Sequence, residues 1–180
     1  ASEYCQKADL VDPITVLIAT GLRRGELLGL RWRDFNAAAA TLTVVGEVVR
    51  KKGEGLRWQD KPKTDRSRRT VPLAPFAVAA LSARRIKPFI GDRQTIFAST
   101  AGTLRDPDNF NKQWGKGRED LSFPDVSSHT FRKSIGTIIG DHGVPVRLIS
   151  DTLGHARVSM THDRYMARGG VHTEVTKGRR

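Results

Sequence analysis

The sequence is poor in the features that mark secreted and membrane-embedded proteins. It has a single cysteine, Cys5, so an internal disulfide is impossible and a cysteine-based zinc site is disfavoured. No apolar run approaches the roughly 20 residues that span a bilayer, and no basic-then-apolar leader opens the chain. The five histidines form no His-x₃-His pair, so we predict no bound metal. We therefore expect a protein of the reducing cytoplasm, without a membrane partner.

Positive charge is what the chain has in excess. Lysine and arginine number 31 against 19 acidic residues, which gives a formal net charge of +12 over 180 residues. The apolar fraction of 38% is too high for a disordered polycation, and the length suits one domain with a sizeable core. A polyanionic partner is indicated. Nucleic acid is favoured over an acidic membrane surface, because no basic amphipathic helix is present.

Local patterns predict a mainly α domain with one small antiparallel β-sheet, an α+β fold. β-Branched residues indicate strands only in the first half, at 41–49, 55–59 and 68–72. Asp12 and Pro13 suit the N-cap and first position of a helix that ends near Gly21. Ser128 suits the cap of a helix that exits at Gly143 and carries Phe131, Ile135, Ile138 and Ile139 on one face. The remaining helices are expected at 24–30, 75–86, 107–121, 146–153 and 159–167.

Several reactive side chains lie beside glycines and apolar runs. Arg23 and Glu26 are three residues apart, as are His129 and Arg132, so each pair shares a helix face. Taken singly, each has an ordinary explanation. An arginine–glutamate pair at this spacing is usually a surface ion pair, and a helical histidine is usually hydrogen-bonded scaffold. A late tyrosine such as Tyr165 is usually a half-buried aromatic.

Four segments together resemble the tyrosine recombinase, or phage integrase, family. They are ATGLRRGELLGLRWRDF, KPKTDRSRRTVPL, HTFRKSIGTII and LGHARVSMTHDRYMA. Each is similar to one signature segment of that family, and all four occur in the family's order and at its usual separations. They extend from about Gly21 to Tyr165, which is essentially the family's whole catalytic domain. One such segment would be weak evidence, whereas four in order are strong evidence.

The resemblance implies a role for each matching residue. Glu26 matches the acidic residue that supports the first catalytic arginine, and Lys61 lies close enough to Lys63 to compete for the role of hairpin lysine. Two positions depart from the family pattern: Gly25 replaces a frequent serine, and Lys133 replaces a frequent histidine. Neither position carries out chemistry. The catalytic set implied by the resemblance is Arg23, Lys63, His129, Arg132, His155 and Tyr165.

The chemistry that the resemblance implies is transesterification without metal, ATP or any other cofactor. The tyrosine hydroxyl attacks a DNA phosphodiester, forms a 3′-phosphotyrosyl bond and releases a 5′-hydroxyl. Two arginines suit the charge that develops on the phosphate, because guanidinium groups bind phosphate oxygens bidentately and stay charged. Lys63 would protonate the leaving oxygen, and His129 would accept the phenol proton.

The resemblance also implies an organisation and partners. Residues 1–180 are expected to form a single catalytic domain, a C-terminal fragment of a longer recombinase without its N-terminal DNA-binding domain. The expected partners are double-stranded DNA, a homo-tetramer on DNA and accessory DNA-bending proteins, with a monomer for the isolated fragment. The setting would be the nucleoid of a bacterial or phage-infected cell. The residues expected near DNA are Arg24, Lys61, Arg66, Arg68 and Lys133.

Other basic residues, Arg69 among them, are expected to contact backbone phosphates or to solvate the surface. Two alternatives stay open from the sequence. One is a type IB topoisomerase, which shares this chemistry but relaxes DNA without exchanging partners. The other is a DNA-binding module that has kept the fold and lost the chemistry. The short chain and the LGH-to-tyrosine segment favour the recombinase.

Overall fold

A computed structural model describes residues 2–60, 68–86 and 94–141, together with Pro145 and Leu153. The six helices in this part are α1 (Glu3–Lys7), α2 (Val11–Thr20), α3 (Arg24–Leu28), α4 (Pro75–Arg85), α5 (Pro107–Asp120) and α6 (Ser128–Asp141). A 3-10 turn, η1 (Trp32–Asp34), precedes the strands β1 (Phe35–Asn36), β2 (Thr41–Val44), β3 (Gly46–Lys51), β4 (Gly55–Asp60) and β5 (Arg69–Pro72). The predicted class, a mainly α fold with a small antiparallel β part, is confirmed.

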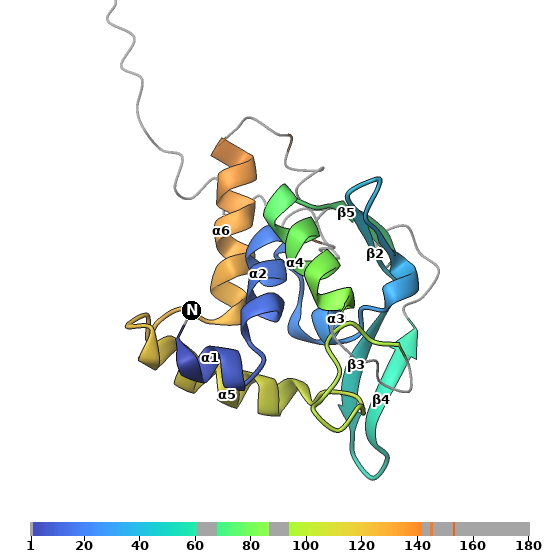
Figure 1. Cartoon of the computed structure of the whole chain (residues 1–180), viewed down its shortest axis with the longest axis vertical. Helices are drawn as coiled ribbons and strands as arrows, with labels where there is room; N and C mark the ends of the chain where they lie inside the picture. Colours follow the sequence, from blue (N-terminus) through green and yellow to red (C-terminus); the bar gives the residue numbers. More distant parts are fainter. Residues whose placement is uncertain (1, 61–67, 87–93, 142–144, 146–152, 154–180) are drawn as a thin grey trace, which may run out of the picture.

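Helix α2 lies at the centre of the helical part. It packs between α4 and α6, while α5 runs beside α1 along one edge of the molecule (Figure 1). Its buried side chains are Pro13, Ile14, Val16, Leu17 and Thr20. The helix begins at Val11 rather than at the predicted Pro13, and Asp12 is not its cap. The largest fully buried side chains are Phe97, Phe110, Leu10, Leu17, Leu22, Leu27, Leu28, Leu30, Leu42, Leu81 and Ile96.

The strands form two sheets rather than the single sheet predicted. Strands β1, β2 and β5 make a three-stranded antiparallel sheet in that order, with Val44 opposite Arg69. Strands β3 and β4 pair separately as a hairpin. The continuous strand predicted at 41–49 is therefore interrupted at Val45. Strand β3 begins directly after it at Gly46, where the lack of a side chain lets the ring of Trp58 pack against the backbone.

Helix α6 begins with a cap one residue earlier than predicted. The Ser127 hydroxyl accepts a hydrogen bond from the Thr130 amide, and the Thr130 hydroxyl accepts one from the Ser127 amide. Phe131 packs against Trp114 of α5 at 5.7 Å between ring centroids. Ile138 was predicted on the same inward face, but it is 53% exposed. The predicted helices at 146–153 and 159–167 lie outside the described residues, apart from Leu153, which is buried.

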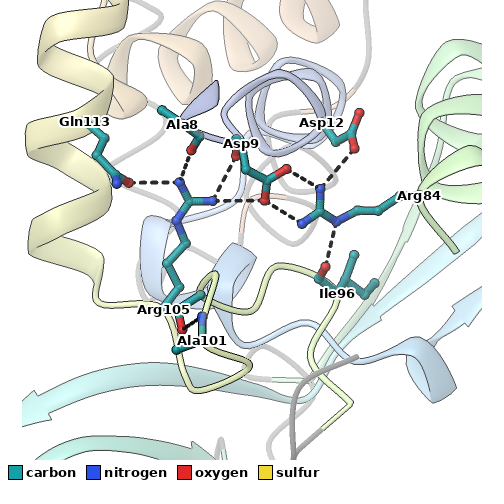
Figure 2. A network of polar contacts seen from close by, with 9 residues as sticks. Ala8, Asp9, Asp12, Arg84, Ile96, Ala101, Arg105 and Gln113 are labelled. Atoms are coloured by element: carbon teal, nitrogen blue, oxygen red, sulfur yellow. Dashed lines mark hydrogen bonds and ion pairs between the residues drawn. The ribbon is translucent and has the colours of Figure 1, made fainter. Parts of the chain in front are cut away.

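A network of buried arginines joins four of the helices. The Arg84 guanidinium donates to both carboxylate oxygens of Asp9, at 2.7 and 2.6 Å, and to Asp12 at 3.0 Å (Figure 2). Arg105 donates to the backbone oxygens of Ala8 and Asp9 and to Gln113 of α5. Burial alone would lower the pKa of Arg84, but Asp9 and Asp12 outweigh it and the pKa is raised. This network fixes α1, α2, α4 and α5 relative to one another.

Within the described part of the chain, no helix is long and apolar enough to cross a membrane.

Candidate active-site cleft

The first predicted pair, Arg23 and Glu26, meets at the start of α3. Arg23 is the N-cap residue, and its backbone amide donates to Glu26 Oε2 at 2.9 Å. Its guanidinium donates to Glu26 Oε1 at 3.0 Å. Glu26 is completely buried, whereas 43% of the Arg23 side chain is exposed. The helix start therefore holds the arginine from its inner side and leaves its outer side towards solvent.

A second arginine, which the sequence did not place here, binds the same carboxylate. Arg69 of β5 donates to Glu26 Oε1 at 3.2 Å and to Glu26 Oε2 at 2.8 Å. Only 6% of its side chain is exposed. The expectation that Arg69 contacts DNA phosphates or solvates the surface is therefore wrong. Its guanidinium is buried because a buried carboxylate needs a paired positive charge.

Arg132 of α6 is held against the segment that carries Arg23. It is 5% exposed and donates to the backbone oxygen of Gly21 at 3.0 Å and to the backbone oxygen of Leu153. Gly21 has a φ of +61°, and a Cβ built on it would lie 3.3 Å from Arg132 Cα. A left-handed residue without a side chain thus ends α2, turns the chain towards Arg23 and lets α6 approach.

The cleft brings together three of the predicted catalytic residues, Arg23, His129 and Arg132, and one predicted DNA contact, Arg24. It has a volume of about 660 Å³ and lies where α3, β3 and the first turns of α5 and α6 meet. Helix α3 approaches β3 closely, because a Cβ on Gly25 would lie 2.9 Å from the Val48 oxygen. The departure from the family's frequent serine thus has a local packing reason. The lining residues are Leu22, Arg23, Arg24, Gly25, Glu47, Val48, Val49, Arg50, Pro107, Asp108, Asn111, Ser127, Ser128, His129 and Arg132.

Acidic residues at the start of α5 face the basic residues of the cleft. Arg50 of β3 forms an ion pair with Asp106, the N-cap of α5. Arg24 Nη2 lies 3.9 Å from Asp108 Oδ1. Burial alone would raise the pKa of Asp106. The hydrogen bond from Arg50 and those from the helix amides outweigh burial and lower it. Sequence reasoning missed Arg50 and Asp108 in the cleft, since both lie outside the four signature segments.

The other predicted residues lie partly outside the cleft and partly outside the described chain. Arg68 pairs with Asp60 at 3.2 Å, next to the end of β4, and Lys133 is exposed on α6. The predicted residues outside the described part are Lys61, Lys63, Arg66, His155 and Tyr165. Among the described residues, no group of three or more His, Cys, Asp or Glu side chains is arranged to hold a metal ion.

The geometry can be set beside known proteins. A family model described as the phage integrase family matches residues 1–169. The chain belongs to the phage integrase family. Two of the four segments by which the sequence resembles that family contribute residues to the cleft, Arg23 from one and His129 and Arg132 from the other.

Two curated relatives are tyrosine recombinases of the XerC type. A tyrosine recombinase XerC-like protein of Caldanaerobacter subterraneus subsp. tengcongensis is 28% identical over 167 residues, covering 81% of this chain and 42% of that protein. Tyrosine recombinase XerC of Rhodospirillum centenum is 33% identical over 149 residues, covering 82% of this chain and 39% of that protein. The chain therefore spans less than half the length of these curated relatives.

A solved structure supports the fold. The Tn1549 transposon integrase in complex with a circular intermediate DNA superposes with a TM-score of 0.78 at 22% sequence identity. The match covers 92% of this chain and 56% of that one. The integrase fold predicted from the sequence segments is thereby confirmed.

Proposed function

We propose that this chain cuts and rejoins DNA as the catalytic domain of a site-specific tyrosine recombinase. One observation carries the proposal: Arg23, His129 and Arg132 line a single cleft in a member of the phage integrase family. Arg24 and Arg50 line the same cleft. Such a concentration of guanidinium groups suits a DNA phosphate, whose oxygens they bind bidentately.

The proposed reaction places the scissile phosphate between Arg23 and Arg132. Attack on the phosphate builds negative charge on its non-bridging oxygens, and fixed positive charge aimed at these oxygens lowers the barrier. Arg132 is suited to this task because backbone carbonyls of Gly21 and Leu153 orient its guanidinium. Arg23 is oriented by Glu26 in the same way. Neither arginine then needs to reorganise during the reaction.

The remaining steps are assigned from the sequence segments. The Tyr165 hydroxyl attacks phosphorus, its proton passes to His129, and the bond to the 5′-oxygen breaks as Lys63 supplies a proton to that oxygen. His155 donates a further hydrogen bond to the phosphate. The 3′-phosphotyrosyl bond keeps the energy of the broken phosphodiester, so a 5′-hydroxyl can reverse the step without ATP or metal.

The proposal extends to the assembly. We propose that the chain is the catalytic part of a longer recombinase and acts as a tetramer on double-stranded DNA, with accessory DNA-bending proteins. Its place of action would be cytoplasmic DNA of a bacterial or phage-infected cell. The two bacterial relatives support a bacterial setting. Arg24, Lys61, Arg66, Arg68 and Lys133 remain proposed DNA contacts.

The covalent intermediate is the direct test. The probe is a library of nicked duplexes with random sequence around the nick. Cleavage near the nick releases a short DNA fragment that diffuses away, so the strand cannot be rejoined and the covalent adduct accumulates. We expect a protein–DNA adduct that survives SDS, because a phosphotyrosyl ester is covalent. Tyr165→Phe should abolish it. Tyr4→Phe, which changes the chain's other tyrosine on α1, should not. An adduct that persists in Tyr165→Phe would assign the nucleophile elsewhere.

The same assay tests the absence of metal chemistry. Excess EDTA should leave the yield of adduct unchanged, because arginines, and not a metal ion, stabilise the phosphate in this scheme. A strict requirement for Mg²⁺ in the cutting step would contradict it. The library sequences enriched in the adduct then supply a defined substrate for rate measurements.

A further inference from the structure

The Glu26 carboxylate is a buried charge shared by two arginines. Its Oε1 accepts from Arg23 Nη1 at 3.0 Å and from Arg69 Nη1 at 3.2 Å. Its Oε2 accepts from the Arg23 backbone amide at 2.9 Å and from Arg69 Nη2 at 2.8 Å. Four donors of the two arginines thus lie on the two carboxylate oxygens, each of which can accept more than one hydrogen bond. The position of the carboxylate is therefore fixed by both arginines together.

The two arginines differ in what lies on their other side. Arg23 lines the cleft and is exposed over 43% of its side chain. Arg69 is buried behind Glu26, on β5, where it lies opposite Val44 of β2. A bidentate guanidinium–carboxylate pair fixes both distance and orientation. The three-stranded sheet thus holds Arg69, Arg69 holds Glu26, and Glu26 holds Arg23 at the cleft.

The charges of the three groups also favour this order. Two guanidinium charges against one carboxylate charge leave one positive charge. Because Arg69 neutralises Glu26 from the interior side, the charge of Arg23 stays available to an anion in the cleft. With Arg69 absent, the buried Glu26 carboxylate would lose one of its two arginine partners and would draw more strongly on Arg23. The ion pair would then compete with a bound phosphate for the same guanidinium.

We propose that Arg69 is a positioning residue of the strand-cutting reaction, acting through Glu26 on the orientation and free charge of Arg23. The inference rests on the function proposed above. It assigns no contact with DNA to Arg69. The sequence spacing gives no hint of it, since Arg69 and Glu26 are 43 residues apart.

The test separates cutting from binding in the full chain. The substrate is the nicked duplex enriched from the random library, and single-turnover cleavage is measured at saturating protein. Arg69→Met should slow cleavage by about 100-fold, because a displacement of about 1 Å in a reacting group costs that much. The affinity for the duplex should change by less than about threefold, since one of many phosphate contacts is altered. Equal losses of rate and affinity would overturn the inference.

Arg69→Lys keeps the positive charge but loses the planar guanidinium that donates to both carboxylate oxygens. It keeps the test valid if Arg69→Met does not fold. A lysine neutralises Glu26 as a point charge but does not fix its orientation. We expect a folded protein that cleaves about tenfold more slowly than the unaltered chain. If Arg69→Lys cleaves as fast as the unaltered chain, the bidentate pair of Arg69 with Glu26 does not orient Arg23, and the positioning role is overturned.

Arg84→Met is the matched structural control. Arg84 is also a buried arginine with a bidentate aspartate partner, but its network with Asp9 and Asp12 lies outside the cleft (Figure 2). Its loss should lower the stability of the fold and leave the cleavage rate of the folded protein unchanged. A similar slowing of cleavage in both variants would reduce the effect of Arg69 to general stability and overturn the inference.

A substrate with a neutral scissile group gives a second measurement, one that a change in the folding stability of the variant would not affect. A methylphosphonate at the scissile position carries no charge on that group, so it depends less on the charge of Arg23. The defect of Arg69→Met should therefore shrink to less than about tenfold on this substrate. The same fold-loss on both substrates would overturn the inference. Failure of the unaltered chain to cut any duplex would instead overturn the proposed function together with this inference.

Discussion

At the scale of single residues, the backbone conformation of Gly21 brings Arg132 close to the segment that carries Arg23. Gly21, two residues before Arg23, ends α2 with a positive φ. Its backbone oxygen accepts a hydrogen bond from the Arg132 guanidinium. The Thr-Gly-Leu context could be read from the sequence, but not that this glycine touches α6. Whether a neighbouring element packs against a glycine cannot be read from the sequence, because it depends on the tertiary fold.

Gly21→Ala should lower the free energy of unfolding by about 1–2 kcal/mol, because an alanine is strained at positive φ. The added methyl would also lie 3.1 Å from a Leu153 methyl and 3.3 Å from Arg132 Cα. Urea unfolding followed by circular dichroism measures the change. Ala19→Gly, in the last turn of α2, is a control for altered helix propensity near the same site. An unchanged unfolding midpoint for Gly21→Ala would show that the turn adapts without strain.

Local and distant residue pairs differ in how well the sequence predicts them. Arg23 and Glu26 could be paired in advance, because a spacing of three places both on one helix turn. Leu27 and Leu28, in the helix predicted at 24–30, are buried beside this pair. The Arg69 partner of Glu26 comes from a strand 43 residues away, and a run of basic residues gives no sign of which one is buried.

At the scale of elements, the type of each predicted helix was easier to obtain than its partners. Helices α4 and α5 begin at their predicted prolines and end within one residue of the predicted position. The strand at 41–49 was predicted as one piece, because β-branched residues run through Val45 without a break. Its two halves pair with β5 and β4, and such pairing depends on contacts that a local pattern does not contain.

The start of α5 makes stability depend on acidic pH. Asp106 caps α5 and pairs with Arg50 of β3, and its pKa lies below the ordinary value of 3.8. A carboxyl with a depressed pKa stabilises the fold above its unfolded pKa, and that contribution is lost as pH falls through the folded pKa. Asp106→Asn keeps a capping oxygen but removes the charge.

We therefore expect Asp106→Asn to be less stable than the unaltered chain at pH 7, with a lower urea midpoint. The gap should persist down to about pH 4 and close at more acidic pH, where Asp106 of the unaltered chain is itself protonated. Urea titrations of both proteins from pH 7 to pH 2.5 measure it. Asp120→Asn, at the other end of α5, supplies the control for a lost surface carboxylate. A gap independent of pH would mean that the ion pair contributes nothing.

At the scale of the whole molecule, the cleft is a product of topology. Its walls come from α3, β3, α5 and α6, which are spread over more than 100 positions of the chain. The four sequence segments predicted six catalytic residues, and three of these six line the cleft. The positions of Lys63, His155 and Tyr165 stay predictions. Arg50 and Asp108 could not be foreseen, because only the folded chain brings β3 and α5 to the same opening.

The central claim is that Arg23 and Arg132 act on the reacting phosphate and do not serve as general DNA anchors. The decisive measurement compares single-turnover cleavage and duplex affinity for Arg23→Ala, Arg132→Ala and Arg132→Lys. Lys116→Ala, on the exposed side of α5 and outside the cleft, removes the same charge as a control. The account predicts that the cleft variants cleave about 100- to 1,000-fold more slowly while affinity falls by less than about tenfold. Matching losses of cleavage and affinity would contradict it.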